Sequence, residues 1–447
     1  MNFKIISLFI LFTFSFGQQK LKFSADSAES LQDNGINIKI FKNNVKIIDQ
    51  NKILYADLAQ YYQDSNKVVL NGNVKMYNNS DSLFCNQLNL IKGNNERYDA
   101  SGDVTFYKDD YIIFSQNLTY FILDDSIEAS TDIVMKDNQK TIYGDNLLIN
   151  YIDNVISNLE MNNNIKFLDS QFYYFKDNSN QQVLNDKIES NNLIIEFDNT
   201  GNISTVKLRG MVKADFNVVS DSLLKGINSV SGDTMFIQFD NELISNMDIK
   251  GGVIGQFKPD RNNKKLNHNV SYNANAVHYN LVDEITFLND NAKVLYGQTI
   301  LEGGLIKADL KNNLVESNTK NSILPSVKNS NEAPTYGDYM LFNLETETGD
   351  IQNGYNEIDM GIFRGDNFFT TKNEDVYIDN GMFTSCNHPD PHYHFASNKM
   401  KVDNNSNQII AKPMIMYIHD LPAFAIPFAI LPNSNSTRKN GFIMYFV

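Results

Sequence analysis

The sequence predicts an all-β protein in which an antiparallel strand unit repeats along the chain, with units that grow from about 30 to about 42 residues. Three observations support this class. The 447 residues include 30 Phe and 22 Tyr, which favour strands. A short marker recurs at a nearly constant interval. Apolar residues alternate with period two, the spacing that places one face of a strand in a core.

The repeat is clearest between residues 55 and 167. The first marker is a leucine that recurs after 30, 30 and 29 residues: Leu58, Leu88, Leu118 and Leu147. The second marker is a β-branched residue that recurs after 30, 29 and 32 residues: Val74, Val104, Ile133 and Ile165. Periods in this range are typical of stacked supersecondary units. Clusters of Asp, Asn, Ser and Gly between the runs predict tight turns.

Proline usage predicts where the array ends. The alternating pattern continues to Leu324 with polar insertions near 177–187, 217–228 and 259–269, which we expect to be surface loops. Of nine prolines, eight lie from Pro325 onward, and a long sheet excludes proline because proline lacks the ladder donor. We therefore expect one β array over 18–324, a connection at 325–335 and a different module at 336–447.

The N-terminus has the pattern of a cleaved signal peptide over residues 1–17. Lys4 precedes an apolar run over 5–16, and the small residues Ser15 and Gly17 precede Gln18. The alternative is an N-terminal membrane anchor. The apolar run is shorter than the roughly 20 residues that a helical span needs, so we expect an exported chain whose mature form begins near Gln18.

Composition and motifs exclude several function classes. The net charge of −15 argues against nucleic acid as a partner. Two cysteines cannot form a disulfide framework. No nucleophile-elbow, zinc-protease or phosphate-loop motif occurs. We therefore expect no enzyme activity and no cofactor. A secreted parallel β-helix polysaccharide-active enzyme is the alternative, but the arginines before Gly255, Arg97 and Arg209, belong to no acidic cluster.

The last hundred residues carry five motifs in a fixed order. These are Thr384-Ser385-Cys386, Pro391-His392-Tyr393, the apolar segment from Pro422 to Pro427, Leu431-Pro432, and Asn440-Gly441-Phe442. This order resembles the lipopolysaccharide-assembly outer-membrane protein family (LptD, formerly OstA). The repeat array also resembles the periplasmic β-jellyroll of that family. Ser385, Asn387 and Asn440 stand where the family usually has Thr, Asp and Ser.

The resemblance implies a function in lipopolysaccharide transport and assembly at the outer membrane. The implied fold is an OstA-like antiparallel β-jellyroll that passes lipid from a periplasmic bridge protein toward an outer-membrane barrel. The implied partners are lipopolysaccharide, the jellyroll bridge protein and an outer-membrane lipoprotein plug, and the implied location is the periplasm or cell outer membrane. Because Val447 follows closely on the motif that opens the family's barrel, we expect a fragment with no complete barrel. A soluble periplasmic bridge protein and an adhesive repeat protein are the alternatives.

Equivalent positions in four units are the candidate lipid-binding residues. They are Val74, Met76, Val104, Phe106, Ile133, Met135, Ile165 and Phe167. Both columns should point between two sheets, where apolar contact would hold acyl chains at ~25 cal/mol per Å2 of buried area. Ordinary core packing is the alternative, because any jellyroll buries such columns.

An alternating segment outside the 30-residue register is the candidate edge for a partner. Ile36, Ile38 and Ile40 share one parity in this segment. An edge strand presents unpaired N–H and C=O groups that pair with another chain, so we expect this segment to dock the bridge protein. In the alternative, it is a first strand that residues 21–23 cover.

Cys386 lies close in sequence to three histidines, His388, His392 and His394, and His419 follows later. Such a set could wrap a zinc ion, but two prolines interrupt it, and a turn before a strand is the simpler interpretation. We assign no metal site. The family resemblance implies that this cysteine is used in a disulfide, and Cys85 is the candidate partner within this chain.

Overall fold

A computed structural model gives the fold of the chain. It describes residues 12–432 except 14–20, 34, 79–80, 109, 175–180, 221–222, 242, 262, 264–265, 267, 330–332, 359–360, 374, 404–405 and 407. Within these residues all regular secondary structure consists of β-strands, so the predicted all-β class is confirmed. The predicted signal peptide, residues 1–17, lies outside the described residues apart from Phe12–Thr13.

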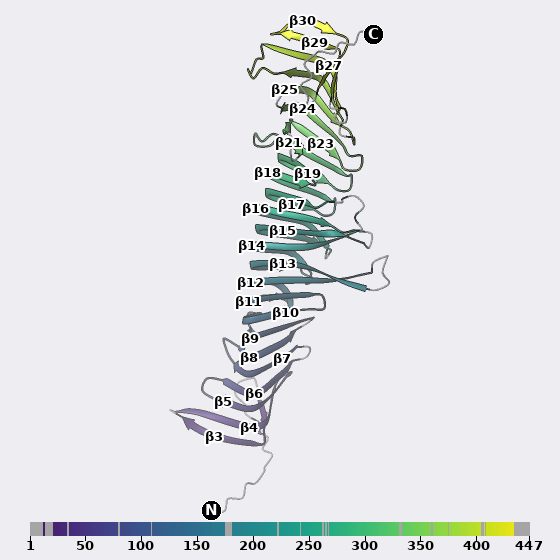
Figure 1. Ribbon diagram of the computed structural model, residues 1–447. Coiled ribbons are helices and arrows are strands. Elements are labelled where there is room, and N and C mark those ends of the chain that lie inside the picture. The colour runs from purple at the N-terminus through teal and green to yellow at the C-terminus, as the bar shows by residue number, and fades with distance from the viewer. Residues whose placement is uncertain are drawn as a thin grey trace, which may run out of the picture. The chain divides into compact units, whose positions relative to one another are not determined.

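The first half of the chain forms these strands: β1 (Phe12–Thr13), β2 (Lys22–Ser24), β3 (Ser27–Asp33), β4 (Ile36–Asp49), β5 (Lys52–Tyr62), β6 (Lys67–Asn78), β7 (Asp81–Ile91), β8 (Arg97–Lys108), β9 (Tyr111–Phe121), β10 (Ser126–Lys136), β11 (Lys140–Ile152), β12 (Val155–Tyr174), β13 (Gln181–Phe197) and β14 (Ile203–Ser220). From β4 to β14 each strand pairs antiparallel with the next, as the repeat predicts. Figure 1 shows these strands as successive rungs in chain order.

The second half continues with β15 (Leu223–Asp240), β16 (Leu243–Pro259), β17 (Val270–Asn280), β18 (Ile285–Tyr296), β19 (Thr299–Asp309), β20 (Leu314–Asn318), β21 (Ser326–Asn329), β22 (Thr335–Tyr336), β23 (Tyr339–Asn343), β24 (Thr348–Ile358), β25 (Gly361–Thr370), β26 (Val376–Thr384), β27 (Tyr393–Asp403), β28 (Gln408–Lys412), β29 (Met414–Ile418), β30 (Leu421–Ile426) and β31 (Ala429–Pro432). The pairing of β20 with β23 carries the ladder across the predicted connection at 325–335.

The chain forms two compact units. One compact unit comprises Met1–Phe216 with Phe236–Leu243, and the other comprises Asn217–Met235 with Ile244–Val447. Proline therefore marks shorter, more irregular strands within the second unit. The predicted connection at 325–335 and the predicted module at 336–447 both lie within this second unit.

A corner in the middle of each long strand folds the ladder of the first unit into two facing layers. In β6 the register shifts between Asn71 and Val74, where Gly72 and Asn73 have φ of +75° and +46°. Asn73 Nδ2 donates to Asp57 Oδ2 at 2.8 Å. A Cβ on Gly72 would lie 2.5 Å from the same oxygen, so this turn favours glycine. Equivalent left-handed pairs occur at 102–103, 131–132 and 163–164.

The two halves of each strand define the layers used below. The first layer comprises halves such as 52–56 and 74–78, and the second layer comprises halves such as 58–62 and 67–71. The chain joins the layers along the corner. The opposite edge, where the hairpin turns of both layers lie, is called the mouth. Buried side chains of both layers point between them, which is the two-sided core that period-two alternation predicts.

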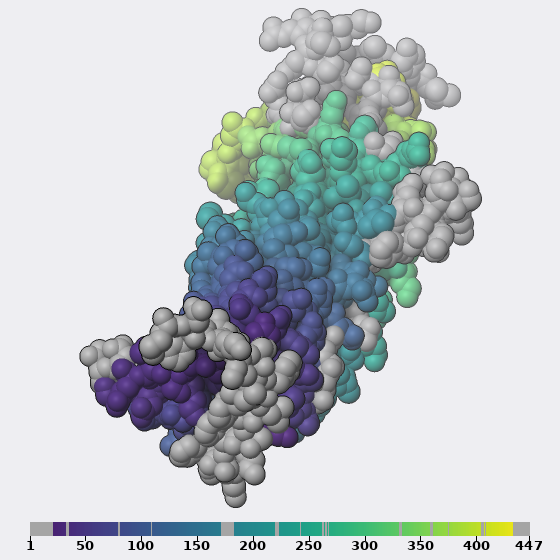
Figure 2. Space-filling view, turned by 90° about the horizontal axis from the view of Figure 1, so that it is seen from below, coloured from purple at the N-terminus to yellow at the C-terminus, as the bar shows by residue number. Residues whose placement is uncertain are grey.

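At the N-terminal end of the first unit, the edge strand differs from the predicted one. Ile36, Ile38 and Ile40 lie in β4, whose residues 36–42 pair with β3 on one side and whose residues 38–42 pair with β5 on the other. β2 pairs with residues 46–48 of β4, so it does not cover the segment over 36–40 as the alternative for residues 21–23 proposed. The prediction that Ile36–Ile40 forms the edge is therefore wrong, because a β3–β4 hairpin supplies one further strand. Figure 2 views this end, with the first strands in purple.

Candidate functional site

The predicted lipid-binding columns lie between the two layers. Val74, Met76, Val104, Phe106, Ile133, Met135 and Ile165 are each at most 7% exposed, and Phe167 is half-buried. The inward orientation expected for both columns is thus present.

The second layer closes over these columns with its own apolar side chains. Leu70, Leu88, Leu90, Leu118 and Ile149 are 0–1% exposed. Phe106 of the first layer contacts Tyr120 of the second, with ring centroids 6.1 Å apart. At the N-terminal end, Phe23 stacks on Phe41 at 4.6 Å. At these described positions the interior is therefore apolar and filled by the chain's own side chains.

Polar side chains connect the two layers at the mouth. They lie between the apolar interior and the solvent. Asp49 of the first layer pairs with Lys92 of the second at 2.5 Å, and Lys92 also pairs with Glu96 at 2.8 Å. The Lys52 ammonium of the first layer donates to the Tyr98 hydroxyl of the second. Asp49 and Tyr98 are 2% and 1% exposed. We call these five residues the upper latch.

Burial shifts the pKa values of residues in the upper latch. Burial lowers the pKa of Lys52. Burial also acts to lower the pKa of Lys92, but hydrogen bonds to Asp49 and Glu96 outweigh it and raise that pKa. The pKa of Tyr98 is raised, first by burial and then by the nearby Asp49 carboxylate. The latch is thus a partly dehydrated ion-pair network whose hydrogen bonds keep Lys92 charged.

A second group of mouth residues repeats the arrangement one unit along. Lys108 Nζ of the first layer lies 3.6 Å from Asp81 Oδ2 and 4.7 Å from the centre of the Tyr151 ring in the second layer. The hydroxyls of Tyr111 and Tyr151 contact each other across the mouth. Lys108 is 6% exposed. We call Asp81, Lys108, Tyr111, Tyr120 and Tyr151 the lower latch, since Lys108 also lies 5.7 Å from the Tyr120 ring.

The second unit contains a comparable polar contact inside its core. Tyr272 donates to Asn228 Oδ1 at 2.8 Å, and its hydroxyl lies 2.6 Å from that of Tyr279. Burial raises the pKa of both tyrosines. Both phenols therefore remain neutral donors at physiological pH.

The corner and the mouth differ in what holds the layers together. At the corner the backbone of every long strand runs from one layer into the other. At the mouth, side chains make the contacts described above. The mouth is the edge along which the layers can separate without breaking a strand. A sequence signal for these residues does exist. Lys52, Asp81 and Lys108 are charged, yet they stand at positions that share the parity of the buried apolar residues.

Both cysteines are free thiols in the structure, and the candidate Cys85–Cys386 disulfide stays a prediction. Cys85 faces the interior of the first unit opposite Val74, and it is 6% exposed. Burial raises the pKa of Cys85 to about 12. Cys386 is half-buried, and hydrogen bonds from the backbone N–H groups of His388 and His392 lower its pKa.

Only some of the histidines near Cys386 in sequence lie close to its thiol. Cys386 Sγ lies 3.4 Å from His392 Nδ1, whose ring lies 5.3 Å from that of His388 and 5.6 Å from that of His419. His394 instead stacks on Tyr417 at 4.8 Å. Across the described residues, no group of three or more His, Cys, Asp or Glu side chains has an arrangement that could hold a metal ion.

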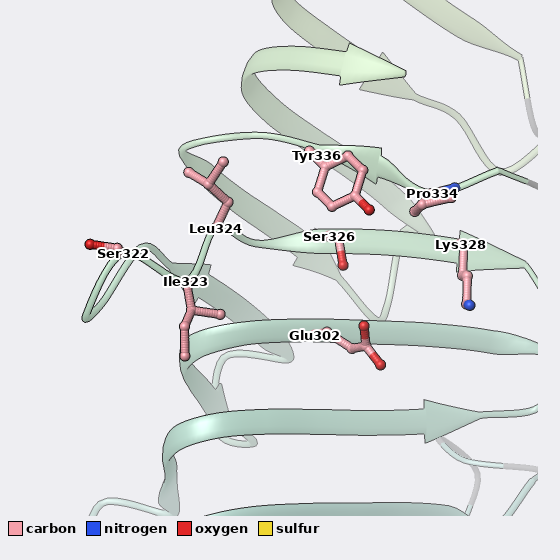
Figure 3. A pocket seen from close by; sticks show the side chains of 8 residues that line it. All are labelled: Glu302, Ser322, Ile323, Leu324, Ser326, Lys328, Pro334 and Tyr336. Carbon is pink, nitrogen blue, oxygen red and sulfur yellow. The ribbon is translucent and has the colours of Figure 1, made fainter. Parts of the chain in front are cut away.

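A hollow of about 390 Å3 on the second unit has a polar rim. Figure 3 shows Glu302, Ser326 and Tyr336 on neighbouring strands, in the order that the register gives. Glu302 pairs with Lys293 at 2.8 Å, so its charge is already compensated. The lining of this hollow mixes these polar groups with apolar side chains such as Ile323 and Leu324, and we assign it no ligand.

Comparison with solved structures gives partial similarities, and LptH is an example. No protein-family model matches the chain, and no curated protein matches it in sequence. The crystal structure of LptH from Pseudomonas aeruginosa is described as the LptA-homologous periplasmic component of the conserved lipopolysaccharide transport device. It is similar to this chain at 16% identity, over 30% of this chain and 82% of LptH, with a TM-score of 0.24. In the described residues, no helix has the length and apolar character to cross a membrane.

Proposed function

We propose that this chain is a lipid-carrying β-jellyroll of the lipopolysaccharide-transport type, which performs no chemistry and holds acyl chains between its two layers. The observation that supports this proposal is the mouth, where side chains connect the two layers. An apolar interior closed on one edge by backbone and on the other by side-chain contacts can admit an elongated apolar ligand from the side. The order of the C-terminal motifs, from Thr384 to Phe442, supports lipopolysaccharide as the lipid.

The proposal includes a path and partners. Lipopolysaccharide reaches the array from a periplasmic jellyroll bridge protein and moves toward an outer-membrane barrel, with an outer-membrane lipoprotein as a further partner. We place the docking edge at β3, because β4 is paired on both sides. An antiparallel strand of the bridge protein would extend the second layer there by β-augmentation.

Site-specific photo-crosslinking tests the proposal. A benzophenone amino acid replaces Phe106, which faces the interior, and in a control it replaces Thr119, which pairs with Asp99 and Glu128 on the outer face of the second layer. The full chain is incubated with lipopolysaccharide and irradiated. We expect a lipid adduct at position 106 and none at 119. Equal labelling at both positions, or no labelling at either, would reject acyl binding between the layers.

A further inference from the structure

The outer face of the first layer has an unusual composition. From β4 to β12 its outward side chains form two cross-strand rows, one starting at Lys46 and Tyr55 and the other at Ile48 and Ile53. Six aromatic residues lie in these rows: Tyr55, Tyr77, Phe84, Tyr107, Phe114 and Tyr143. We call this surface the aromatic face.

Four rings of the aromatic face form a connected stripe that reaches solvent. Tyr77 meets Tyr55 edge to face at 6.3 Å and Phe84 at 5.8 Å, and Phe84 meets Tyr107 at 5.9 Å. Tyr55, Tyr77, Tyr107 and Tyr143 are 38–40% exposed. A contiguous set of exposed rings is uncommon on a soluble surface and marks a binding site more often than a chance cluster.

Positive charge accompanies the rings. The two rows contain four lysines, Lys46, Lys75, Lys136 and Lys166, and no Asp or Glu among their described residues. Lys136 lies 5.1 Å from the Phe114 ring, and Lys166 lies 5.7 Å from the Tyr143 ring. These are cation–π distances. From β4 to β12 these two rows thus carry no carboxylate in a chain with a net charge of −15, and Glu189 of β13, opposite Lys166, is the next acid along them.

The second layer provides the contrast. Its outer row includes Asp99, Thr119, Glu128 and Glu160 at matching cross-strand positions. Its carboxylates make the kind of mixed, acidic surface that the net charge leads one to expect. The absence of acids from the described rows of the aromatic face is therefore specific to one layer, and it points to an anionic ligand.

Exposed rings and lysines together fit a sugar chain that carries phosphate or carboxylate groups. The C–H faces of a pyranose are weakly positive and fit against the negative face of an aromatic ring. Lysine supplies the charge for phosphate. Tyrosine gives rigid contact area together with a hydroxyl donor. Charge complementarity thus favours an anionic glycan over a purely apolar partner surface.

The aromatic face adjoins the mouth, which connects it to the proposed function. Neighbouring residues of a strand point to opposite faces, so outward Tyr107 directly precedes Lys108 of the lower latch, and outward Tyr77 directly precedes inward Asn78 at the mouth. A lipid whose acyl chains pass through the mouth would emerge beside these two tyrosines.

We propose that the aromatic face binds the phosphorylated sugar portion of the lipid whose acyl chains lie between the layers. This inference rests on the proposed function and adds a second subsite to it, outside the core. The rings stack on the sugars, and Lys75 and Lys136 pair with the phosphates.

Binding of the sugar without its acyl chains tests this subsite. The probe is deacylated lipopolysaccharide, a phosphorylated core oligosaccharide, titrated into the full chain by calorimetry. We expect saturable binding that weakens about tenfold when the probe is dephosphorylated. Tyr77→Thr with Tyr107→Thr should weaken binding by tenfold or more, while threonine preserves strand propensity. The matched control is Phe121→Thr, since Phe121 lies on the outer face of the second layer.

Further variants and controls separate this inference from the proposed function. Lys75→Gln with Lys136→Gln should weaken binding and flatten its salt dependence, even where the tyrosine variant folds poorly. Inorganic phosphate alone should not compete at millimolar concentration, which separates the glycan from free phosphate. No binding, or equal loss in the Phe121 control, overturns the aromatic face, whatever the crosslinking at position 106 gives. Oligosaccharide binding without an adduct at position 106 removes the acyl site and leaves the sugar subsite.

Discussion

Replacing Lys92 with methionine is expected to lower the free energy of unfolding by about 3–5 kcal/mol. Asp49 is 2% exposed and pairs with Lys92 at 2.5 Å. Methionine fills a similar volume but leaves this carboxylate buried without its cation. Chemical denaturation of the variant and the wild type at pH 7 measures the loss.

The chain offers a matched control for this effect. Lys42 and Glu29 are also 2.5 Å apart, but both side chains are about half exposed, so Lys42→Met should cost less than about 1 kcal/mol. Adding Asp49→Asn to Lys92→Met should recover part of the stability. Because the pKa of Lys92 is raised, its stabilising contribution is complete below its ordinary pKa and is lost as the pH rises beyond it. Equal costs for Lys92 and Lys42 would show that burial adds nothing to the latch.

Replacing Phe106 with alanine is expected to cost about 3–5 kcal/mol. Phe106 is 1% exposed and packs against Tyr120 across the interior. Removing the ring leaves a cavity that neighbouring strands cannot fill without bending. Phe121→Ala, on the outer face of the second layer, is the control and should cost about 1 kcal/mol or less.

The Phe106 result also bears on how lipid binds. A loss of this size would mean that the lipid-free interior is a packed core, so that acyl chains must exchange contacts with side chains that already fill it. An unchanged melting temperature would indicate a solvated trough instead, contrary to the burial of these columns.

Much of the fold was predictable because local and tertiary signals agree. The spacing of Leu58, Leu88 and Leu118 and the alternation around Val74 and Val104 come from strands that pair with their sequence neighbours. Local pairing of this kind makes register readable from sequence. The left-handed residues at the corner, such as Gly72 and Asn73, also coincide with the second marker.

Other features could not be predicted because they depend on strand pairing and on contacts between the two layers. The segment over 36–40 alternates like an edge strand, but β3 covers it, and only the hairpin pairing determines this. The latches were not predicted because Lys52 and Lys108 are charged residues at positions of buried parity, and charged residues are usually exposed. Their partners, Tyr98 and Tyr151, lie more than 40 residues away in sequence, across the mouth.

The central claim is that lipid reaches the interior through the mouth, and a reversible lock across the mouth tests it most directly. Tyr111→Cys and Tyr151→Cys place thiols on opposite sides of the mouth, in a Cys386→Ser background. A short disulfide-containing bis-maleimide joins them, and a reductant releases them. Asp99→Cys with Thr119→Cys gives the same linkage within the second layer and is the control.

The readout is the lipopolysaccharide adduct at a benzophenone in position 106. The account predicts that the locked mouth prevents the adduct, that reduction restores it, and that the control linkage leaves it unchanged. Full adduct formation with the mouth locked would contradict lateral uptake between the two layers.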